Sequence, residues 1–356
     1  MLKWMPIIET AESFGVGNTP LLPIRKLGSA FPGVRILAKA EWANPGGSIK
    51  DRPALRMVLQ ARQNGRFKPG HILLDSTSGN TGIAYAWLGA RLGFKVRLAV
   101  PGNINPERKR ILLAYGAELE LTSPLDGSDG AIRHARALFK EDPDSYFYPD
   151  QYGNPENWKA HYLGTGPEIW DQTEGSVTHF VAGLGTSGTF RGVVSSLKER
   201  NLALRAISVQ PDGALHGLEG LKHMGTSILP GIYDPSLSDE ELFIGTEEAQ
   251  ALVRRAAREE GLLIGSSSGA NLAASLRIAE SLHRAGRGGT VVTVFPDSGE
   301  RYLSTPLFTA KEAPTLQFYN TLAQAKEAFD PRRAGEATIF TDGPASKKEI
   351  ALTYDD

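Results

Sequence analysis

The chain has 356 residues, of which 41% are hydrophobic and 22% are charged. This length and composition indicate a globular protein of about two domains and exclude intrinsic disorder. The 39 basic and 40 acidic residues leave a net charge of −1, which gives no general attraction for nucleic acid or an anionic membrane. The absence of cysteine excludes disulfides, iron–sulfur clusters, cysteine zinc sites and thiol nucleophiles, and no metal site is expected.

Neither a membrane span nor a secretory signal is expected. No apolar run approaches the ~18 residues that a spanning helix needs. Residues 1–10 lack the apolar stretch and small-residue cleavage site of a signal peptide. We therefore expect a cytoplasmic protein.

Short β-branched runs alternate with helix-period segments along most of the chain. The predicted strands are Ile72–Leu74, Lys95–Val100, Val177–Ala182, Ala206–Val209 and Val291–Phe295. The predicted helices are Gly82–Leu92, Pro106–Tyr115, Gly130–Lys140, Glu247–Glu260 and Ala270–Leu282. This alternation is typical of an α/β protein, with doubly wound parallel sheets covered by helices on both faces. The turn-rich stretch Asp150–Trp158 is the best candidate for a crossing between two α/β units.

The first segment whose residues could take part in catalysis or binding is Asn44–Arg52 (NPGGSIKDR). Its first four residues favour a turn, and a helix is predicted to begin near Lys50 because Pro53 fits only in a first turn. Lys50 would then face the positive end of a helix dipole, which lowers the pKa of an amine and suits a nucleophile or a Schiff-base lysine. An ordinary solvated lysine is the alternative.

Two further segments lie between a predicted strand and a helix. Ser76–Gly82 (STSGNTG) offers hydroxyls and backbone amides to a carboxylate or a phosphate, although a plain capping loop fits equally well. Gly183–Thr189 (GLGTSGT) satisfies the dinucleotide pattern G-x-G-x-x-G. That pattern also needs an acidic residue closing the next strand, but this strand ends in Gln210–Pro211. The added hydroxyls favour a compact terminal phosphate.

Two more polar loops also lie at the end of a predicted strand or at the start of a predicted helix. Phe295–Thr305 (FPDSGERYLST) comes directly after a predicted strand, and Gly265–Ala270 (GSSSGA) opens a long helix. Two anion cradles and an isolated lysine together point to a cofactor with one phosphate and one carbonyl, such as pyridoxal phosphate, and to an amino-acid substrate.

The motifs NPGGSIKDR, TSGNTG, GLGTSGT, GSSSGA and PDSGERYLST, in this order, resemble the fold-type II pyridoxal-phosphate enzymes of the cysteine synthase and cystathionine β-synthase family. The likeness covers about residues 15–305. It implies a smaller, mobile domain over residues 48–152, which closes on the substrate, and a larger domain from residues 1–47 and 153–305. Residues 306–356 would form a C-terminal extension, and the protein would be a homodimer.

The resemblance also implies roles for individual residues. Lys50 matches the lysine that bonds the cofactor and moves a proton at the substrate α-carbon. The other implied cofactor-binding residues are Asn80, at the cofactor's 3′-hydroxyl, Gly185, Thr186, Ser187, Gly188 and Thr189, at its phosphate, and Ser298, at its pyridine nitrogen. The implied substrate-binding residues are Thr77, Ser78, Gly79, Thr81 and Gln151, at the carboxylate, with Lys222 as a candidate contact to a phosphorylated donor.

The implied reaction is a β-replacement, through an α-aminoacrylate, in which an activated L-serine and a sulfur donor give L-cysteine. The residues leave open whether the activated serine is O-acetyl-L-serine or O-phospho-L-serine. The sulfur source is either sulfide or a thiocarboxylated carrier protein. Competing interpretations are a cystathionine β-synthase acting on L-serine and homocysteine, a dehydratase of the same fold, an inactive binding protein, and an NAD-dependent oxidoreductase using GLGTSG.

Overall fold

The structure is a computed structural model, and it describes residues 11–77, 79–309, 317–319 and 338–340. The chain divides into two units, Met1–Leu303 and Ser304–Asp356. Of the second unit, the structure describes helix α10 (Pro306–Thr309) and two short parallel strands, β11 (Gln317–Tyr319) and β12 (Thr338–Phe340). Most of the predicted extension, residues 306–356, therefore lies outside the described residues.

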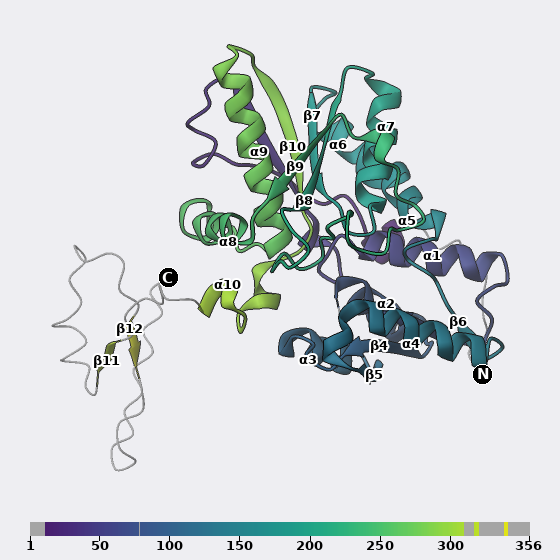
Figure 1. Cartoon of the computed structure of the whole chain (residues 1–356). Coiled ribbons are helices and arrows are strands. Elements are labelled where there is room, and N and C mark those ends of the chain that lie inside the picture. Colours follow the sequence, from purple (N-terminus) through teal and green to yellow (C-terminus); the bar gives the residue numbers. More distant parts are fainter. Residues whose placement is uncertain (1–10, 78, 310–316, 320–337, 341–356) are drawn as a thin grey trace. The chain divides into compact units, whose positions relative to one another are not determined.

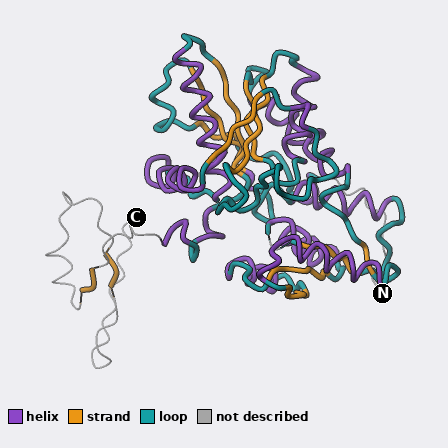
Figure 2. Tube along the Cα trace, in the orientation of Figure 1, coloured by secondary structure: helices purple, strands orange, loops and turns teal. Residues whose placement is uncertain are grey.

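The first unit contains a six-stranded sheet (Figures 1 and 2). Its strands, in spatial order, are β1 (Leu21–Pro23), β2 (Val34–Ala40), β10 (Gly289–Phe295), β7 (His179–Gly183), β8 (Arg205–Pro211) and β9 (Glu240–Ile244). All neighbours are parallel except β1, which pairs antiparallel with β2. Central strands such as β10 are buried on both faces, which explains their continuous apolar sequence.

The same unit contains a second, four-stranded sheet, which is parallel throughout. Its spatial order is β5 (Glu118–Thr122), β4 (Val96–Pro101), β3 (Ile72–Ser76) and β6 (Tyr146–Phe147). The whole sheet falls within the predicted smaller domain, residues 48–152. The proposed mobility of that range stays a prediction.

Helices cover both sheets. They are α1 (Asp51–Gln63), α2 (Asn80–Leu92), α3 (Pro106–Ala114), α4 (Gly127–Glu141), α5 (Pro155–Ala160), α6 (Gly166–Gln172), α7 (Gly188–Arg200), α8 (Thr246–Arg255) and α9 (Ser266–Arg284). Single turns are η1 (Glu12–Phe14), η2 (Glu41–Ala43), η3 (Pro124–Asp126), η5 (Pro235–Leu237) and η7 (Gly299–Tyr302), and η4 (His161–Thr165) and η6 (Ala256–Glu260) are π-helical. Figure 1 shows α8 and α9 on one side of the larger sheet and α6 and α7 on the other.

Alternating side chains of the smaller sheet build two separate cores. Leu73 and Leu98 pack into a large cluster with residues of α1 and α2. Their neighbours Leu74 and Ala99 face the opposite way, against Ala131 and other residues of α4. This follows from the two-residue period of a strand, and it explains why these strands read as unbroken apolar runs.

The predicted strands and helices are confirmed, with boundaries that shift by a few residues. The predicted strands are β3, β4, β7, β8 and β10, and the predicted helices are α2, α3, α4, α8 with η6, and α9. The prediction did not include β2, which pairs along its full length with β10 in the larger sheet. Within the described part of the chain, no helix is long and apolar enough to cross a bilayer.

Candidate active site

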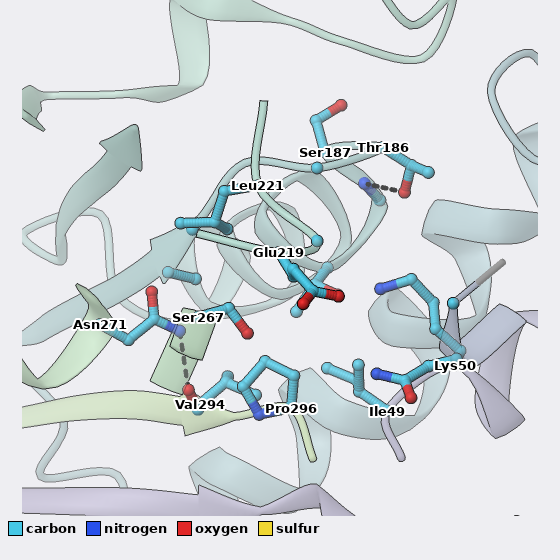
Figure 3. Close-up of a pocket in the computed structure, with 18 of the residues that line it drawn as sticks. Ile49, Lys50, Thr186, Ser187, Glu219, Leu221, Ser267, Asn271, Val294 and Pro296 are labelled. Carbon is cyan, nitrogen blue, oxygen red and sulfur yellow. Dashed lines mark hydrogen bonds between the residues drawn. The ribbon is translucent and has the colours of Figure 1, made fainter. Parts of the chain in front are cut away.

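A cavity opens where the carboxyl ends of β7 and β10 meet the starts of several helices (Figure 3). Its walls also include the segments that open α2 and α9 and part of the loop between β8 and β9. Parallel sheets bind their ligands at this edge. Polar residues in the wall include Lys50, Asn80, Thr186, Ser187, Thr189 and Ser267.

Lys50 immediately precedes α1, and its segment is bound to the end of β10. The Ile49 amide donates to the Pro296 carbonyl at 2.9 Å. Ser48 pairs with Asp297 in an antiparallel bridge. The backbone beside Lys50 is therefore held in place, and the side chain reaches into the cavity (Figure 3). The predicted start of a helix near Lys50 is confirmed.

Burial lowers the pKa of the Lys50 amine, while the carboxylates of Asp297 and Glu41 act to raise it. The sequence predicted the same direction from the dipole of the following helix. The main cause is instead the loss of hydration around the charged amine. A lower pKa increases the fraction of neutral amine, which is the form that attacks a carbonyl carbon or accepts a proton.

The loop between β7 and α7 is shaped by close backbone approaches. Ser187 has a φ of 66°, a left-handed conformation that residues other than glycine rarely adopt. A Cβ at Gly185 would collide with the Gly220 carbonyl oxygen, and a Cβ at Gly188 would collide with the Asn157 side chain. The Ser187 hydroxyl is buried and has no hydrogen-bond partner among the described residues. The loop thus offers an unused hydroxyl at the start of a 13-residue helix, an arrangement suited to a phosphate.

A series of hydrogen bonds connects this loop to the start of α2. Thr81 Oγ1 donates to Gln151 Oε1 at 2.8 Å. Asn157 Nδ2 donates to the Gln151 carbonyl at 2.7 Å and to Thr186 Oγ1 at 3.2 Å. Two residues predicted to bind the substrate carboxylate, 70 positions apart in the sequence, are therefore direct partners.

The other predicted carboxylate ligands lie in the loop that follows β3. Gly79 lines the cavity, and its amide donates to Thr77 Oγ1 at 3.3 Å. Ser78 lies outside the described residues. This loop therefore adjoins the cavity that Lys50 also lines.

Asn80 is held between two charged groups at the end of β10. Its Nδ2 donates to Asp297 Oδ2 at 2.7 Å, and its Oδ1 accepts from Arg301 Nη1. The Tyr302 hydroxyl donates to the same Asp297 oxygen at 2.7 Å. The sequence marked this segment as a polar loop and, through the family resemblance, singled out only Ser298 within it. Asp297 and Arg301 were missed because their contacts with Asn80 span more than 200 positions.

Two predicted residues lie in other cavities. Ser298 lines a second cavity, with Trp42 and Leu263. Lys222 lines a third, where its Nζ lies 5.2 Å from the centroid of the Tyr152 ring. Burial lowers the pKa of Lys222.

Ser267 was not predicted as a site residue, although the GSSSGA motif containing it was noted. It lies in the first turn of α9 and lines the cavity together with Lys50 (Figure 3). Motif reading alone could not choose among its three consecutive serines. The cavity lining distinguishes them.

His161 is a further residue that the sequence did not reveal. Its Nε2 lies 3.3 Å from Thr189 Oγ1, and its Nδ1 lies 3.0 Å from Thr165 Oγ1. Burial, reinforced by the nearby Arg52 and Lys50 cations, lowers the pKa of His161 well below its ordinary value. A neutral imidazole therefore orients the Thr189 hydroxyl at the cavity wall.

Comparisons with known proteins identify the family of this chain. Residues 12–297 match the family model of the pyridoxal-phosphate dependent enzymes. The chain is 51% identical to a cysteine synthase of Aquifex aeolicus over 299 residues, which are 83% of this chain and 91% of the relative. It is 42% identical to cysteine synthase B of Salmonella typhimurium, over 82% of this chain and 94% of the relative.

Solved structures point the same way. The crystal structure of a cysteine synthase from Entamoeba histolytica matches with a TM-score of 0.79 and 38% identity, covering 88% of this chain and 94% of that chain. These matches favour a pyridoxal-phosphate enzyme over the NAD-dependent alternative for the GLGTSG loop. The chain belongs to the cysteine synthase and cystathionine β-synthase family of fold-type II pyridoxal-phosphate enzymes.

Proposed function

We propose that this protein is a pyridoxal-phosphate-dependent cysteine synthase. It replaces the β-substituent of an activated L-serine with sulfur, and L-cysteine is the product. The observation that carries the proposal is that Lys50 and the loop between β7 and α7 line one cavity. That cavity lies in a chain 51% identical to a cysteine synthase.

The residues of the cavity fit pyridoxal phosphate. The buried, unpartnered Ser187 hydroxyl and the backbone amides of Gly185–Thr189 would hold its phosphate at the start of α7. Asn80 would contact its 3′-hydroxyl. When bound, the cofactor supplies an aldehyde that joins an amine and a ring that withdraws electrons from the substrate α-carbon.

Lys50 has two tasks in this proposal. Its amine would hold the cofactor's aldehyde carbon in the resting enzyme. With the substrate bound, the free amine of Lys50 would remove the α-proton and later return it. The lowered pKa of Lys50 increases the fraction of neutral amine available for both tasks, and such proton transfer contributes about 10²–10⁴-fold to the rate.

We assign the substrate carboxylate to the loop after β3. Thr77, Ser78, Gly79 and Thr81 would bind it, with Gln151 holding the Thr81 hydroxyl. Lys222 remains a candidate contact to a phosphorylated donor, but it lines a neighbouring cavity. Closure of residues 48–152 over the substrate would exclude water.

We reassign the contact with the pyridine nitrogen: Ser267, and not Ser298, would make it. Ser267 lines the same cavity as Lys50, whereas Ser298 lines a different one. A neutral hydroxyl does not keep the nitrogen protonated, so the ring is a weaker electron sink and loss of the β-substituent is favoured.

The partners in this proposal are an amino-acid donor and sulfide. A thiocarboxylated carrier protein is the alternative sulfur source. A homodimer and a cytoplasmic location are proposed from the family resemblance. Light scattering of the purified protein tests the dimer.

The test compares Lys50→Ala with Lys95→Ala, which removes an amine from an exposed position. Lys50→Ala should lose the visible absorbance of the bound cofactor and all L-cysteine formation from O-acetyl-L-serine or O-phospho-L-serine with sulfide. Lys95→Ala should keep both. An unchanged visible band in folded Lys50→Ala would overturn the role of Lys50. A coloured wild-type enzyme that forms cysteine from neither donor would overturn the proposed activity.

A further inference from the structure

Two charged side chains of the cavity wall have no part in the proposed function. Arg108, in the first turn of α3, and Glu219, in the loop between β8 and β9, form an ion pair there. The Arg108 side chain is 8% exposed, whereas the Glu219 side chain is 40% exposed. The cation is therefore part of the inner wall, and its carboxylate partner is open to solvent.

Arg108 is held in position by contacts that do not involve Glu219. Asn105 caps α3, and its Oδ1 accepts from the Arg108 amide at 3.3 Å. Asn105 Nδ2 donates to the Arg301 carbonyl at 3.0 Å. The Arg108 guanidinium carbon lies 4.8 Å from the centroid of the Tyr302 ring, a cation–π arrangement. The guanidinium is thus preorganised beside the cavity.

Arg108 also has unused binding capacity. Its Nε is buried and has no hydrogen-bond partner among the described residues. Glu219 lies outside any helix or strand, next to Gly220, whose φ is +89°. The two members of the pair are therefore carried by separate elements, a helix and a loop. The Glu219 carboxylate itself shows that an anion fits against Arg108 from the cavity side.

The proposed reaction produces one anion to which no residue of this cavity is assigned, since the candidate Lys222 lines another cavity. The substrate carboxylate is assigned to the loop after β3, and the cofactor phosphate to the loop after β7. When the Cβ–O bond breaks, its electron pair leaves with the oxygen, as acetate or as phosphate. The described wall of the cavity contains two cationic side chains, Lys50 and Arg108. Because Lys50 already has a role, Arg108 is the cation available to bind this anion.

We propose that Arg108 receives the departing anion and that Glu219, by sharing this cation, favours a singly charged leaving group over a doubly charged one. This inference rests on the proposed function. Acetate carries one negative charge, whereas a phosphate ester approaches two above its second pKa of about 6. A carboxylate beside the leaving-group site repels the second charge more strongly. O-acetyl-L-serine is therefore the preferred donor.

The experiment measures kcat and KM of the holoenzyme for O-acetyl-L-serine and O-phospho-L-serine, with sulfide as nucleophile. Glu219→Gln removes the charge and keeps the shape. We expect it to shift the kcat/KM ratio toward O-phospho-L-serine by about tenfold. The shift should grow from pH 5.5 to pH 7.5 as the phosphate ionises. Glu247→Gln makes the same charge change at an exposed position of α8 and should leave the ratio unchanged.

Two variants of Arg108 test the cation directly. Arg108→Gln should lower kcat for both donors by about 100-fold, because it removes a charge that acts on the leaving group. Arg108→Lys should restore part of that loss. A binding measurement complements the kinetics: the Glu219→Gln holoenzyme should bind inorganic phosphate about tenfold more tightly than wild type in calorimetry.

The outcomes separate this inference from the proposed function. If the wild type turns over a donor but Glu219→Gln leaves both the donor ratio and phosphate binding unchanged, the role of Glu219 is wrong. If folded Arg108→Gln keeps wild-type kcat for both donors, Arg108 does not receive the leaving group. If the wild-type holoenzyme turns over neither donor, the proposed function itself fails.

Discussion

The loops after β3 and after β7 occupy equivalent places, each joining a buried parallel strand to a helix, yet they work differently. The shape of the β7 loop is set by its backbone. Neighbouring atoms leave no room for a side chain at Gly185 or Gly188, and Ser187 has a left-handed conformation. The β3 loop and the first turn of α2 after it depend on side chains, such as the Thr81 hydroxyl bound to Gln151. A phosphate suits converging amides, whereas an amino-acid carboxylate also needs specific side-chain partners.

The difference teaches which changes each loop tolerates. Adding one atom to the β7 loop should destroy its shape, whereas removing a hydroxyl from the β3 loop should weaken substrate binding and spare the cofactor. The strands that lead into the loops differ as well. β3 carries the buried carboxyl Asp75, whereas β7 ends in Ala182 and Gly183.

The largest expected effect comes from Gly185→Ala. The new Cβ would meet the Gly220 carbonyl oxygen, and backbone has little freedom to move away. We expect the affinity for pyridoxal phosphate, measured by titrating the apoenzyme and following visible absorbance, to fall about 100-fold or more. Gly213→Ala is the matched control, because a Cβ there meets nothing within 4 Å. Equal cofactor affinities in the two variants would show that the loop is not a phosphate site.

Asp75→Asn should change the pH dependence of stability. Burial raises the pKa of Asp75 to about 7 from 3.8, so the folded state holds a proton that the unfolded state has released. The free energy of unfolding of the wild type should therefore fall as pH rises from about 4 to 7. From pH 4 to pH 8, Asp75→Asn should gain a few kcal/mol of stability relative to wild type in urea unfolding. A constant difference between the two proteins would mean an ordinary pKa for Asp75.

Thr81→Val should separate substrate binding from cofactor binding. Valine keeps the shape of threonine but cannot donate to Gln151 Oε1 or to a carboxylate. We expect KM for the amino-acid donor to rise about tenfold, the loss typical of one hydrogen bond to a charged group. The visible absorbance should remain that of the wild type. Loss of cofactor together with substrate affinity would contradict the division of tasks between the loops.

The smallest effect is expected at the pyridine nitrogen. Ser267→Ala should lower kcat severalfold, because one neutral hydrogen bond contributes about 1 kcal/mol. It should also shift the visible absorbance maximum of the bound cofactor. Ser298→Ala should change neither quantity. The reverse result would return the contact to Ser298 and show that the cavity lining misidentifies it.

Much of the site could be predicted from local sequence. As expected, Lys50 precedes a helix and the GLGTSGT loop joins a strand to a helix, while α2 begins at Asn80, two residues before its predicted start at Gly82. Turn residues and strand ends are local features, because backbone sterics and helix capping act over a few positions. The choice between Ser298 and Ser267 is the opposite case. Both serine motifs follow a strand or open a helix, and only the packing of distant segments decides which serine faces Lys50.

The charged residues around the cavity show most clearly what local sequence could not predict. In the sequence, Arg108 belongs to the run PERKR, which resembles any solvated helix start. Its pairing with Glu219 joins residues 111 positions apart, and Asn80 meets Arg301 across 221 positions. No local pattern contains such contacts.

The sequence by itself determined the α/β class, the loops that face the cavity and the lysine in its wall. Each of these depends on interactions between near neighbours in the chain, which residue type and spacing specify. Only the tertiary structure decided that Ser267 rather than Ser298 lines the cavity, that burial rather than a helix dipole lowers the pKa of Lys50, and that Arg108 lies in the wall. Desolvation and long-range pairing arise when distant segments pack together, so they exist only in the folded chain.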